Sequence, residues 1–422
     1  MKNIIYILAA VVFAFTACEK ESFDYASFKV SSSDIDSVYF STGSKTLIAD
    51  GKASLQFVLE TFRTVQVEGE GGASIDSLMF VDYKKLPESD IQIFADGEPI
   101  NGFEYSTTDL EKETVEFYAK VGDKVSAKKQ VFIRSPQLEP DKRYVDLIFH
   151  VFELNATDDS YDPLTYQQIS KEQLEEAVRY ANVVFNNING KDANGASANF
   201  EFRLAERNAA GVALEVPGIN RIVYDSSWKA SPTAVFMPAN FINRINSTPA
   251  YQWDKEQFVN IYVLPLAANS AIGDNRAAYQ IVPSGELPLE GISNRIQHES
   301  EVPSDNFFNI FGLGIHRTVF FPDDSRNIEI AGYLGKYYGL YSTHSTTSEV
   351  VDYLGDTKKY NSSVNNSKSL LKVGLDGEKF LANNAMDDIR YASLRNSFTL
   401  DQINRMRTVM EWSPVRKAWK TN

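Results

Sequence analysis

The hydrophobic pattern of this chain changes its period at residues 135–143, and this change constrains the fold more than any other feature. From Ser37 to Arg134, short runs with alternate apolar residues, such as SIDSLMFV and TVEFYAKVG, are separated by Gly, Asp, Asn and Pro. A two-residue period with frequent turn signals is typical of an all-β sandwich. The segment SPQLEPDKR at 135–143 has prolines and no hydrophobic period, so it predicts a linker.

The region after the linker combines buried strands with an amphipathic helix. YVDLIFHVFEL at 144–154, ANFEFRLAE at 198–206 and FVNIYVLPL at 258–266 are apolar runs that predict strands. After the first strand, ISKEQLEEAVRYANVVFNNING has a capping box of Ser170 and Gln173, followed by apolar residues at helical spacing. Strand, helix, strand and strand in this order indicate an α/β or α+β domain.

Residues 267–325 are rich in Gly, Pro, Asn and Asp and show little hydrophobic period. They predict a long excursion with one or two short strands, such as HRTVFF at 316–321. The sequence leaves open whether this excursion covers a cleft.

Length and charge limit the class of protein. A chain of 422 residues is expected to form two or three domains, and its 43% of apolar residues can fill a core in each. The formal net charge of −14 argues against nucleic-acid binding, because a nucleic-acid partner requires a basic patch that displaces phosphate counterions.

The N-terminus carries an export signal. Lys2 is followed by an apolar run from Ile4 to Ala17, which is too short to span a bilayer and predicts a signal peptide over 1–17. The stretch FTAC resembles a bacterial lipobox, so Cys18 is expected to be lipidated and to begin a tether over 18–36. Because Cys18 is the only cysteine, lipidation excludes disulfides and thiolate metal sites. EKES, which follows, resembles a Bacteroidetes surface-export signal and predicts the outer membrane or cell surface of a Gram-negative bacterium.

The all-β region resembles a known domain class. LIADGKASLQFVLE at 47–60 and GDKVSAKKQVFIR at 122–134 resemble the first and last strands of a bacterial immunoglobulin-like domain. The resemblance implies an immunoglobulin-like sandwich over 37–134.

Residues 144–422 resemble a protease family in the order of their segments. These segments are LIFHVFEL, ISKEQLEEAVRYANVVFN, ANFEFRLAERNAAG with GINRI, VNIYVLPL, NNAMDD, and SFTLDQINRMRTVMEWSPVRKAWK. Their order resembles the pappalysin-like branch of the metzincin metalloproteases, as found in zinc-dependent metalloprotease lipoproteins of Bacteroides. The resemblance implies an α+β zincin fold with zinc as cofactor, a Met-turn at Met386 and a closing helix.

Each fixed residue of the family motif H-E-x-x-H-x-x-G-x-x-H has a role in binding zinc or activating water. Two histidines four residues apart ligate zinc from one helix face, and the glutamate polarises the zinc-bound water. The glycine lets the chain turn back and deliver the third histidine. EIAGYLGKYYGLYSTHS at 329–345 falls where the family carries this motif.

The functional positions of the motif are replaced in this chain. Aligned on GLY, Gly332 and Lys336 take the places of the first two histidines, Tyr333 that of the glutamate, and Ser342 that of the third histidine. The scaffold positions remain: Leu334, Gly335, Gly339, Leu340 and Tyr341. The replacements predict that the zinc of the family is lost together with the catalytic base.

A further hypothesis concerns the place of the Lys336 side chain. A cation in place of a zinc ligand disfavours metal, and its ammonium group is expected to fill the cavity, with Asp387, Asp388 or the Tyr333 hydroxyl as partner. These four residues therefore define the predicted cleft. The loop VVDYLGDTKKYNSS resembles the family loop in which an aspartate-threonine pair closes the cleft, here 356 and 357.

The histidines offer little for a shifted metal site. They are His150, His298, His316 and His344. His150 lies in an apolar strand and predicts a core histidine with a backbone partner. His298 and His316 predict ordinary surface or strand residues, and only His344, two positions after Ser342, is a candidate ligand.

The sequence leaves three hypotheses about function. In the first, an inactive metzincin-like lipoprotein binds a peptide, a glycan or a partner protein in its retained cleft. In the second, the chain is an active zinc-dependent metallopeptidase with a relocated ligand set. In the third, the β region is the working part and the protease-like region is a spacer.

Overall fold

The computed structural model describes residues 30–159, 161, 168–229, 238–265, 279–292, 294–302, 312–322 and 327–420. The predicted signal peptide, Cys18 and most of the predicted tether lie outside these ranges, as does much of the predicted excursion over 267–325. Whether that excursion covers a cleft is therefore outside the described residues too. Among the residues described, none of the helices has the length and apolar character needed to cross a membrane.

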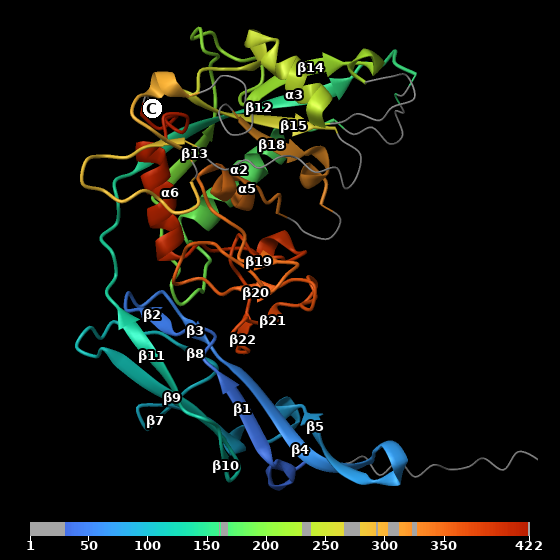
Figure 1. Cartoon of the computed structure of the whole chain (residues 1–422), viewed down its shortest axis with the longest axis vertical. Helices are drawn as coiled ribbons and strands as arrows, with labels where there is room; N and C mark the ends of the chain where they lie inside the picture. The colour runs from blue at the N-terminus through green and yellow to red at the C-terminus, as the bar shows by residue number, and fades with distance from the viewer. Residues whose placement is uncertain are drawn as a thin grey trace, which may run out of the picture.

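The N-terminal part is built from strands (Figure 1). One sheet has the order β1–β4–β5, and the other has the order β2–β11–β9–β6–β7, with β10 on β9 and a separate β3–β8 ladder. The bounds are β1 (Ser37–Ser41), β2 (Thr46–Ile48), β3 (Leu55–Gln56), β4 (Val58–Glu68), β5 (Ser74–Val81), β6 (Ile91–Ala95), β7 (Glu98–Ile100), β8 (Glu104–Tyr105), β9 (Thr114–Val121), β10 (Lys124–Val125) and β11 (Lys129–Arg134).

The strands of this β region surround one hydrophobic core. Phe117, Ala119 and Val121 of β9 are fully buried, because the two-residue period places them on one face of the strand. The strand pattern confirms the prediction of an all-β region, whereas the immunoglobulin-like class and the domain boundaries stay predictions. Ala193 and Leu400 of the C-terminal part complete the same core.

The C-terminal part contains a parallel sheet of the order β13–β12–β15–β18, with β14 also beside β12. The bounds are β12 (Arg143–Leu154), β13 (Phe200–Leu204), β14 (Ile219–Tyr224), β15 (Phe258–Leu264) and β18 (Gly312–His316). These strand pairs are all parallel, so this part is mixed α/β rather than the expected α+β. Strands β12 and β15 are buried on both faces, which explains their continuous apolar runs.

Helices cover both faces of the parallel sheet. Helix α2 (Lys171–Phe185) begins at the predicted capping box, in which Ser170 and Gln173 bond each other's backbone N–H groups. Helix α3 (Pro238–Asn246), which was not predicted, packs Phe241 and Ile245 against Phe152 on the opposite face. Helices α5 (Ala331–Tyr337) and α6 (Leu400–Trp412) complete the described α-helices.

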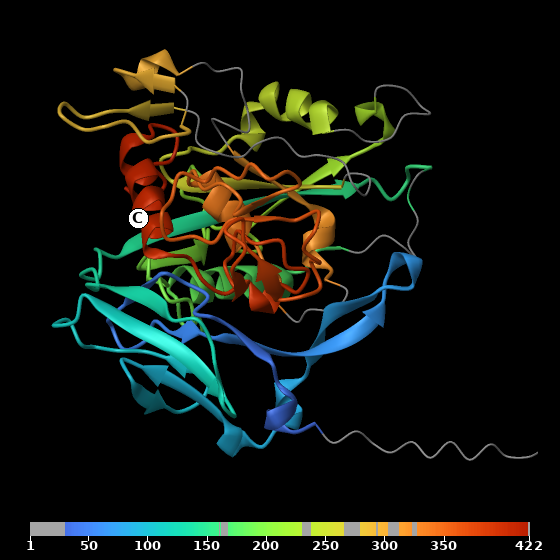
Figure 2. The same cartoon turned by 60° about the horizontal axis from the view of Figure 1, so that its bottom comes forward.

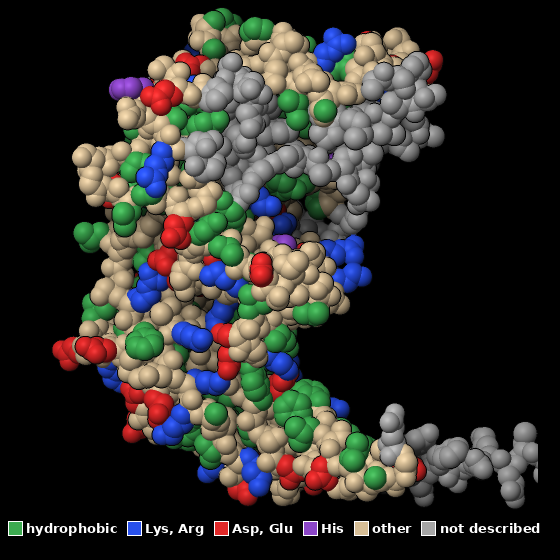
Figure 3. Space-filling view, in the orientation of Figure 1, with side chains coloured by type: hydrophobic (Ala, Val, Ile, Leu, Met, Phe, Trp, Pro, Cys, Tyr) green, Lys and Arg blue, Asp and Glu red, His purple; other side chains and the backbone are tan. Residues whose placement is uncertain are grey.

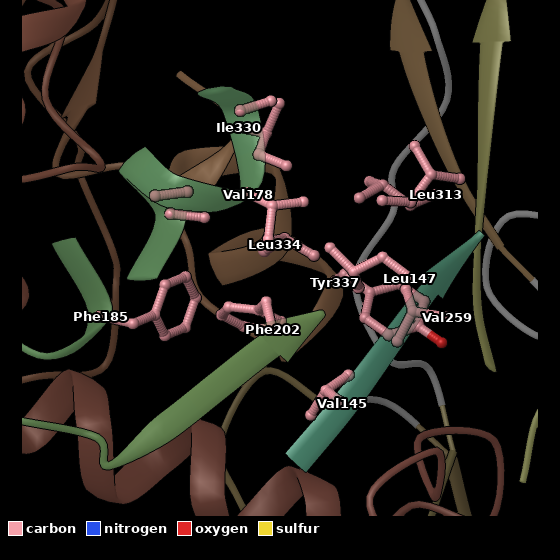
Figure 4. Close-up of a cluster of buried hydrophobic side chains, with 14 of the residues drawn as sticks. Val145, Leu147, Val178, Phe185, Phe202, Val259, Leu313, Ile330, Leu334 and Tyr337 are labelled. Atoms are coloured by element: carbon pink, nitrogen blue, oxygen red, sulfur yellow. The ribbon is translucent and has the colours of Figure 1, made fainter. Parts of the chain in front are cut away.

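The largest core lies between the sheet and helices α2, α5 and α6. Figure 4 shows side chains from the sheet, α2 and the region of α5 pointing toward one another: Val145, Leu147, Val178, Phe185, Phe202, Val259, Leu313, Ile330, Leu334 and Tyr337. Alternate residues of β12 supply one face of this core, because side chains two apart in a strand point the same way. The core therefore fixes where α5 lies against the sheet.

One strand prediction is wrong. The segment HRTVFF at 316–321 does not form a strand, because β18 ends at His316 and residues Arg317–Phe320 form a 3-10 helix. Phe320 is buried in the large core and packs edge-on against Phe149, so its apolar character serves tertiary packing instead. Two other short strands of the region are β16 (Tyr279–Ile281) and β17 (Asn294–Ile296).

Short ladders lie between the parallel sheet and the β region (Figure 1). They are β19 (His344–Ser345), β20 (Tyr360–Asn361), β21 (Leu371–Val373) and β22 (Lys379–Leu381). The Tyr39 hydroxyl of β1 accepts a hydrogen bond from the backbone N–H of Lys379 in β22 at 2.8 Å. Glu60 of β4 accepts a hydrogen bond from Lys379 Nζ at 2.5 Å. The two parts of the molecule are thus joined by direct polar contacts.

The resemblance implied that Asp356 and Thr357 close the cleft, and this stays a prediction; the structure shows other contacts for both residues. The Asp356 carboxylate accepts a hydrogen bond from Thr399 at the start of α6 and pairs with Arg134 of β11 at 3.0 Å. Thr357 donates to Asp352. Asp356 therefore joins α6 to the β region, because three polar groups converge on its carboxylate, the Asp401 N–H included.

Candidate functional site

Helix α5 holds most of the residues that the sequence analysis aligned with the metzincin motif. Its first turn is capped by Glu329, whose Oε1 accepts a hydrogen bond from the Gly332 N–H at 2.7 Å. Its end is a Schellman turn, in which the Leu340 N–H donates to the Gly335 carbonyl and the Gly339 N–H donates to the Lys336 carbonyl, both at 2.9 Å. Gly339 has a φ of +90°, so it performs the reversal that the sequence assigned to this glycine.

The segment around Met386 packs beneath α5. The Asn384 N–H donates a hydrogen bond to Asp387 Oδ2 at 2.9 Å. The Met386 N–H donates one to Asn384 Oδ1, also at 2.9 Å. A β-carbon at Gly335 would lie 3.1 Å from Met386 Sδ, a tight contact, so the helix packs closely against this turn. The return of the chain after Gly339 is held to the same turn by Thr343, whose Oγ1 donates to Asp387 at 2.5 Å.

These elements enclose a pocket of about 150 Å³. It is lined by Glu329, Gly332, Tyr333, Lys336, Ser342, His344, Ala385, Met386, Asp387 and Arg395. The four replaced motif positions, the weak metal candidate His344, Met386 and Asp387 are therefore brought together by the fold. Asp388 is not part of this lining; its N–H donates to the Tyr360 hydroxyl at 2.6 Å.

Position 332, which the sequence analysis aligned with the first family histidine, has no room for a side chain. A β-carbon at Gly332 would lie 2.7 Å from the Ala385 carbonyl oxygen and 3.7 Å from Glu329 Oε2. The first distance is shorter than any ordinary contact, and the obstacle is backbone. The turn around Met386 therefore occupies space that a side chain at position 332 would need.

Lys336 lines the pocket, and the residue is exposed to solvent. The hypothesis that its ammonium group fills the cavity stays a prediction. Asp387, a partner considered for it, is 6% exposed, and its two oxygens accept hydrogen bonds from Thr343 and Asn384. Burial raises the pKa of Asp387 to about 7, against the lowering effect of these donors.

Glu329 and Arg395 were missed by the sequence analysis. Glu329 is 3% exposed, and its Oε2 lies 2.8 Å from Arg395 Nη2, an ion pair in the pocket wall. The contact lacks the geometry of a hydrogen bond, since Glu329 Oε2 has no donor aligned on it. The position of Glu329 three residues before Gly332 is a capping signal, whereas nothing in the sequence connects Arg395 to this helix.

Tyr333 and His344 are the remaining titratable side chains of the pocket. Burial raises the pKa of Tyr333, and the nearby Glu329 carboxylate adds to the rise, so the phenol stays protonated. Burial lowers the pKa of His344, and Lys336, Lys372 and Arg395 lower it further, against Asp388. His344 is thus a neutral imidazole in positive surroundings.

The other histidines lie away from the pocket. His150 is fully buried, with Nε2 2.9 Å from Asn260 Oδ1 and Nδ1 2.9 Å from Asn220 Nδ2. The prediction of a core histidine is confirmed, but its partners are asparagine side chains rather than the backbone. Burial lowers its pKa to about 4, so it is neutral. His298 is exposed and His316 is half-buried at the end of β18.

The residues present do not fit the zinc that the family resemblance implies. Zinc sites in proteins take three or four N, O or S ligands from side chains. The carboxylates of Glu329 and Asp387 are engaged by the contacts above, and His344 is the one neutral nitrogen ligand in the lining. Within the described ranges, no three His, Cys, Asp or Glu residues are grouped so that they could hold a metal ion.

Comparisons with known proteins give structural neighbours only. No protein-family model and no curated protein matches this chain. Mature mirolysin of Tannerella forsythia in complex with a cleaved peptide is 18% identical, covers 66% of this chain and 96% of its own, and has a TM-score of 0.40. A promirolysin mutant of that organism is 18% identical, with coverages of 67% and 86% and a TM-score of 0.43. Mirolysin in complex with compound 9 has a TM-score of 0.41 at 18% identity, with coverages of 66% and 96%.

Mirolysin is a metzincin-type metallopeptidase. The similarity to it covers about two thirds of the present chain. The lipoprotein assignment, the Bacteroides family and the replaced motif stay predictions from the sequence.

Proposed function

We propose that this chain is a metalloprotease-like protein without catalytic zinc, whose retained pocket binds a peptide, a glycan or a partner protein. The observation that carries the proposal is the pocket wall itself. Gly332, Tyr333, Lys336 and Ser342 line it where a metzincin would present three histidines and a glutamate, and the Ala385 carbonyl blocks a side chain at position 332.

The chemistry of the lining supports binding rather than hydrolysis. Peptide hydrolysis by a metzincin needs a Lewis acid and a base that activates water. Tyr333 stands in the position of that base, and its raised pKa keeps it protonated at neutral pH. Arg395, Lys336 and Glu329 instead give the pocket charged groups of both signs, which suit polar contacts with a ligand.

The proposal includes a location. Lipidation of Cys18 after removal of residues 1–17 would attach the protein to the outer membrane or cell surface of a Gram-negative bacterium. The net charge of −14 supports the exclusion of nucleic acid from the set of partners. The described part of the chain would then be held outside the membrane by the tether over 18–36.

Metal content decides between this proposal and a protease with relocated ligands. Residues 18–422 carrying Cys18→Ser are purified without chelator, and zinc is measured by mass spectrometry before and after incubation with zinc. We expect less than about 0.1 equivalent in both samples. Near one equivalent that is lost in His344→Ala would contradict the proposal and favour the active metallopeptidase.

Ligand binding is measured separately with labelled random octapeptides in fluorescence anisotropy. We expect binding that is lost when Ser342→Trp fills the pocket and kept when Leu138→Trp is placed on the linker, where Leu138 is 90% exposed. Equal binding by both variants would show that the pocket is not the binding site. Peptide binding by the isolated β region would favour the third hypothesis, in which the β region is the working part and the protease-like region is a spacer.

A further inference from the structure

Strands β4 and β5 form a two-stranded arm that extends beyond the rest of the β region (Figures 1 and 2). Strand β5 is the edge of its sheet, and within the described chain it pairs with β4 alone. All its residues except Ser77 and Val81 are exposed. The outer edge of β5 therefore presents unpaired backbone N–H and C=O groups to solvent.

The arm also exposes apolar side chains on both faces. Ile75, Leu78 and Phe80 are 52%, 62% and 54% exposed, values unusual for large apolar residues. In the space-filling view, hydrophobic side chains lie on this projection, which borders an open hollow beneath the C-terminal part (Figure 3).

One face of the arm continues the contact between the two parts of the molecule. Tyr39 is opposite Glu60, and Phe62 is opposite Phe80, so these four residues share one face of the sheet. Tyr39 and Glu60 bind β22, whereas Phe62 and Phe80 pack edge-on and leave Phe80 open. The apolar surface is thus an extension of an interface that the protein already uses.

Edge strands of soluble proteins are normally protected by lysine, proline or a bulge. The β5 sequence SIDSLMFV contains neither lysine nor proline. Its one charge, Asp76, accepts a hydrogen bond from Gln66 inside the arm and does not guard the edge. An unprotected apolar edge of eight residues indicates a strand that is covered in the working protein.

We propose that β5 pairs antiparallel with β5 of a second copy of this chain, about a two-fold axis at Leu78. In this register Leu78 faces Leu78, Ile75 faces Val81, Ser77 faces Met79 and Asp76 faces Phe80. No carboxylate opposes a carboxylate, which matters for a chain with a net charge of −14.

The symmetry limits the assembly to two copies. Both partners use the same edge, so the contact is isologous and closes on itself instead of forming a fibre. A single pair of eight-residue strands is a small interface compared with the roughly 1,200 Å² of a stable complex, so we expect a weak, concentration-dependent dimer. Tethering of both copies to one membrane would raise their effective concentration.

Self-association is tested on residues 18–422 with Cys18→Ser, by sedimentation velocity over a range of concentrations. We expect a concentration-dependent dimer that Leu78→Lys weakens at least tenfold. The matched control is Leu138→Lys, which makes the same change at an exposed leucine of the linker and should leave the dimer unchanged. A protein that stays monomeric at every concentration overturns the proposal.

The register of the two β5 strands is then tested with single cysteine substitutions, because the Cys18→Ser protein contains no other thiol. Leu78→Cys lies on the proposed axis and should form an intermolecular disulfide at low micromolar protein. Phe80→Cys would lie about 13 Å along the strand from its copy, beyond disulfide reach, and should cross-link no more than Leu138→Cys. Cross-linking of Phe80→Cys above that of Leu78→Cys overturns the proposed register.

Discussion

Gly332 shows how one position decides what the pocket can do. The turn around Met386 lies so close to α5 that the Ala385 carbonyl takes the space of a side chain at position 332. A histidine placed there would have to move backbone, because the obstacle is not the end of a flexible side chain. The absence of a side chain at position 332 is therefore built into the packing around it.

Asp387 carries a pH dependence of stability. Burial raises its pKa from 3.8 to about 7 in the folded protein. The folded state then binds a proton more tightly than the unfolded state, so stability contributed by the neutral carboxyl is lost as pH rises from about 4 to about 7. The whole shift corresponds to at most about 4 kcal/mol.

We expect Asp387→Asn to remove this dependence. The free energy of unfolding of the variant, relative to the wild type, should rise between pH 4.5 and pH 8 by up to about 3 kcal/mol, measured by urea denaturation. Asp123→Asn, at a side chain that is 78% exposed, should follow the wild type at every pH. A constant difference between Asp387→Asn and wild type across the range would contradict the assignment.

At the scale of elements, the end of α5 depends on a backbone conformation that only glycine adopts without strain. Gly339 has a φ of +90°, and a β-carbon there would lie 2.8 Å from Val409 of α6. The left-handed conformation alone costs an L residue about 1–2 kcal/mol, and the contact with Val409 adds a packing cost.

We therefore expect Gly339→Ala to lower the free energy of unfolding by about 3 kcal/mol. Gly377→Ala is the control, since Gly377 has a similar φ of +78° but no atom within 4 Å of the added carbon. It should cost only the conformational part, about 1–2 kcal/mol. Equal losses in chemical denaturation would show that the contact between α5 and α6 does not matter.

At the scale of the whole molecule, Arg134 ties the β region to the C-terminal part. Its two terminal nitrogens lie 3.0 Å from Asp356 and 2.8 Å from Asp401, and the Asp356 side chain is only 2% exposed. Removing the guanidinium leaves a buried carboxylate without its cation. Such a loss typically costs about 3–5 kcal/mol, less here because Arg134 is itself partly exposed.

We expect Arg134→Met to destabilise the protein by about 2–3 kcal/mol and to separate the unfolding of the two parts. The β region would unfold first in urea, since Ala193 and Leu400 no longer complete its core securely. Lys128→Met, which breaks an exposed pair with Glu116, should cost under about 1 kcal/mol. A single transition unchanged from wild type would argue against this coupling.

The sequence by itself determined the local features of this protein. The two-residue period predicted an all-β N-terminal part, and the capping box at Ser170 predicted the start of α2, because both depend on neighbours within a few residues. The reversal at Gly339 was predicted for the same reason, since a left-handed residue is a local requirement.

Only the tertiary structure decided how these elements meet. It made the strands β12 to β18 parallel and ended β18 at His316. It also placed Arg395 beside Glu329 in a pocket most of whose other members the sequence had named. It also left Lys336 exposed and closed position 332 with the Ala385 carbonyl. Contacts between residues tens of positions apart depend on packing of the whole core, and a local pattern contains no information about which distant backbone will fill a given space.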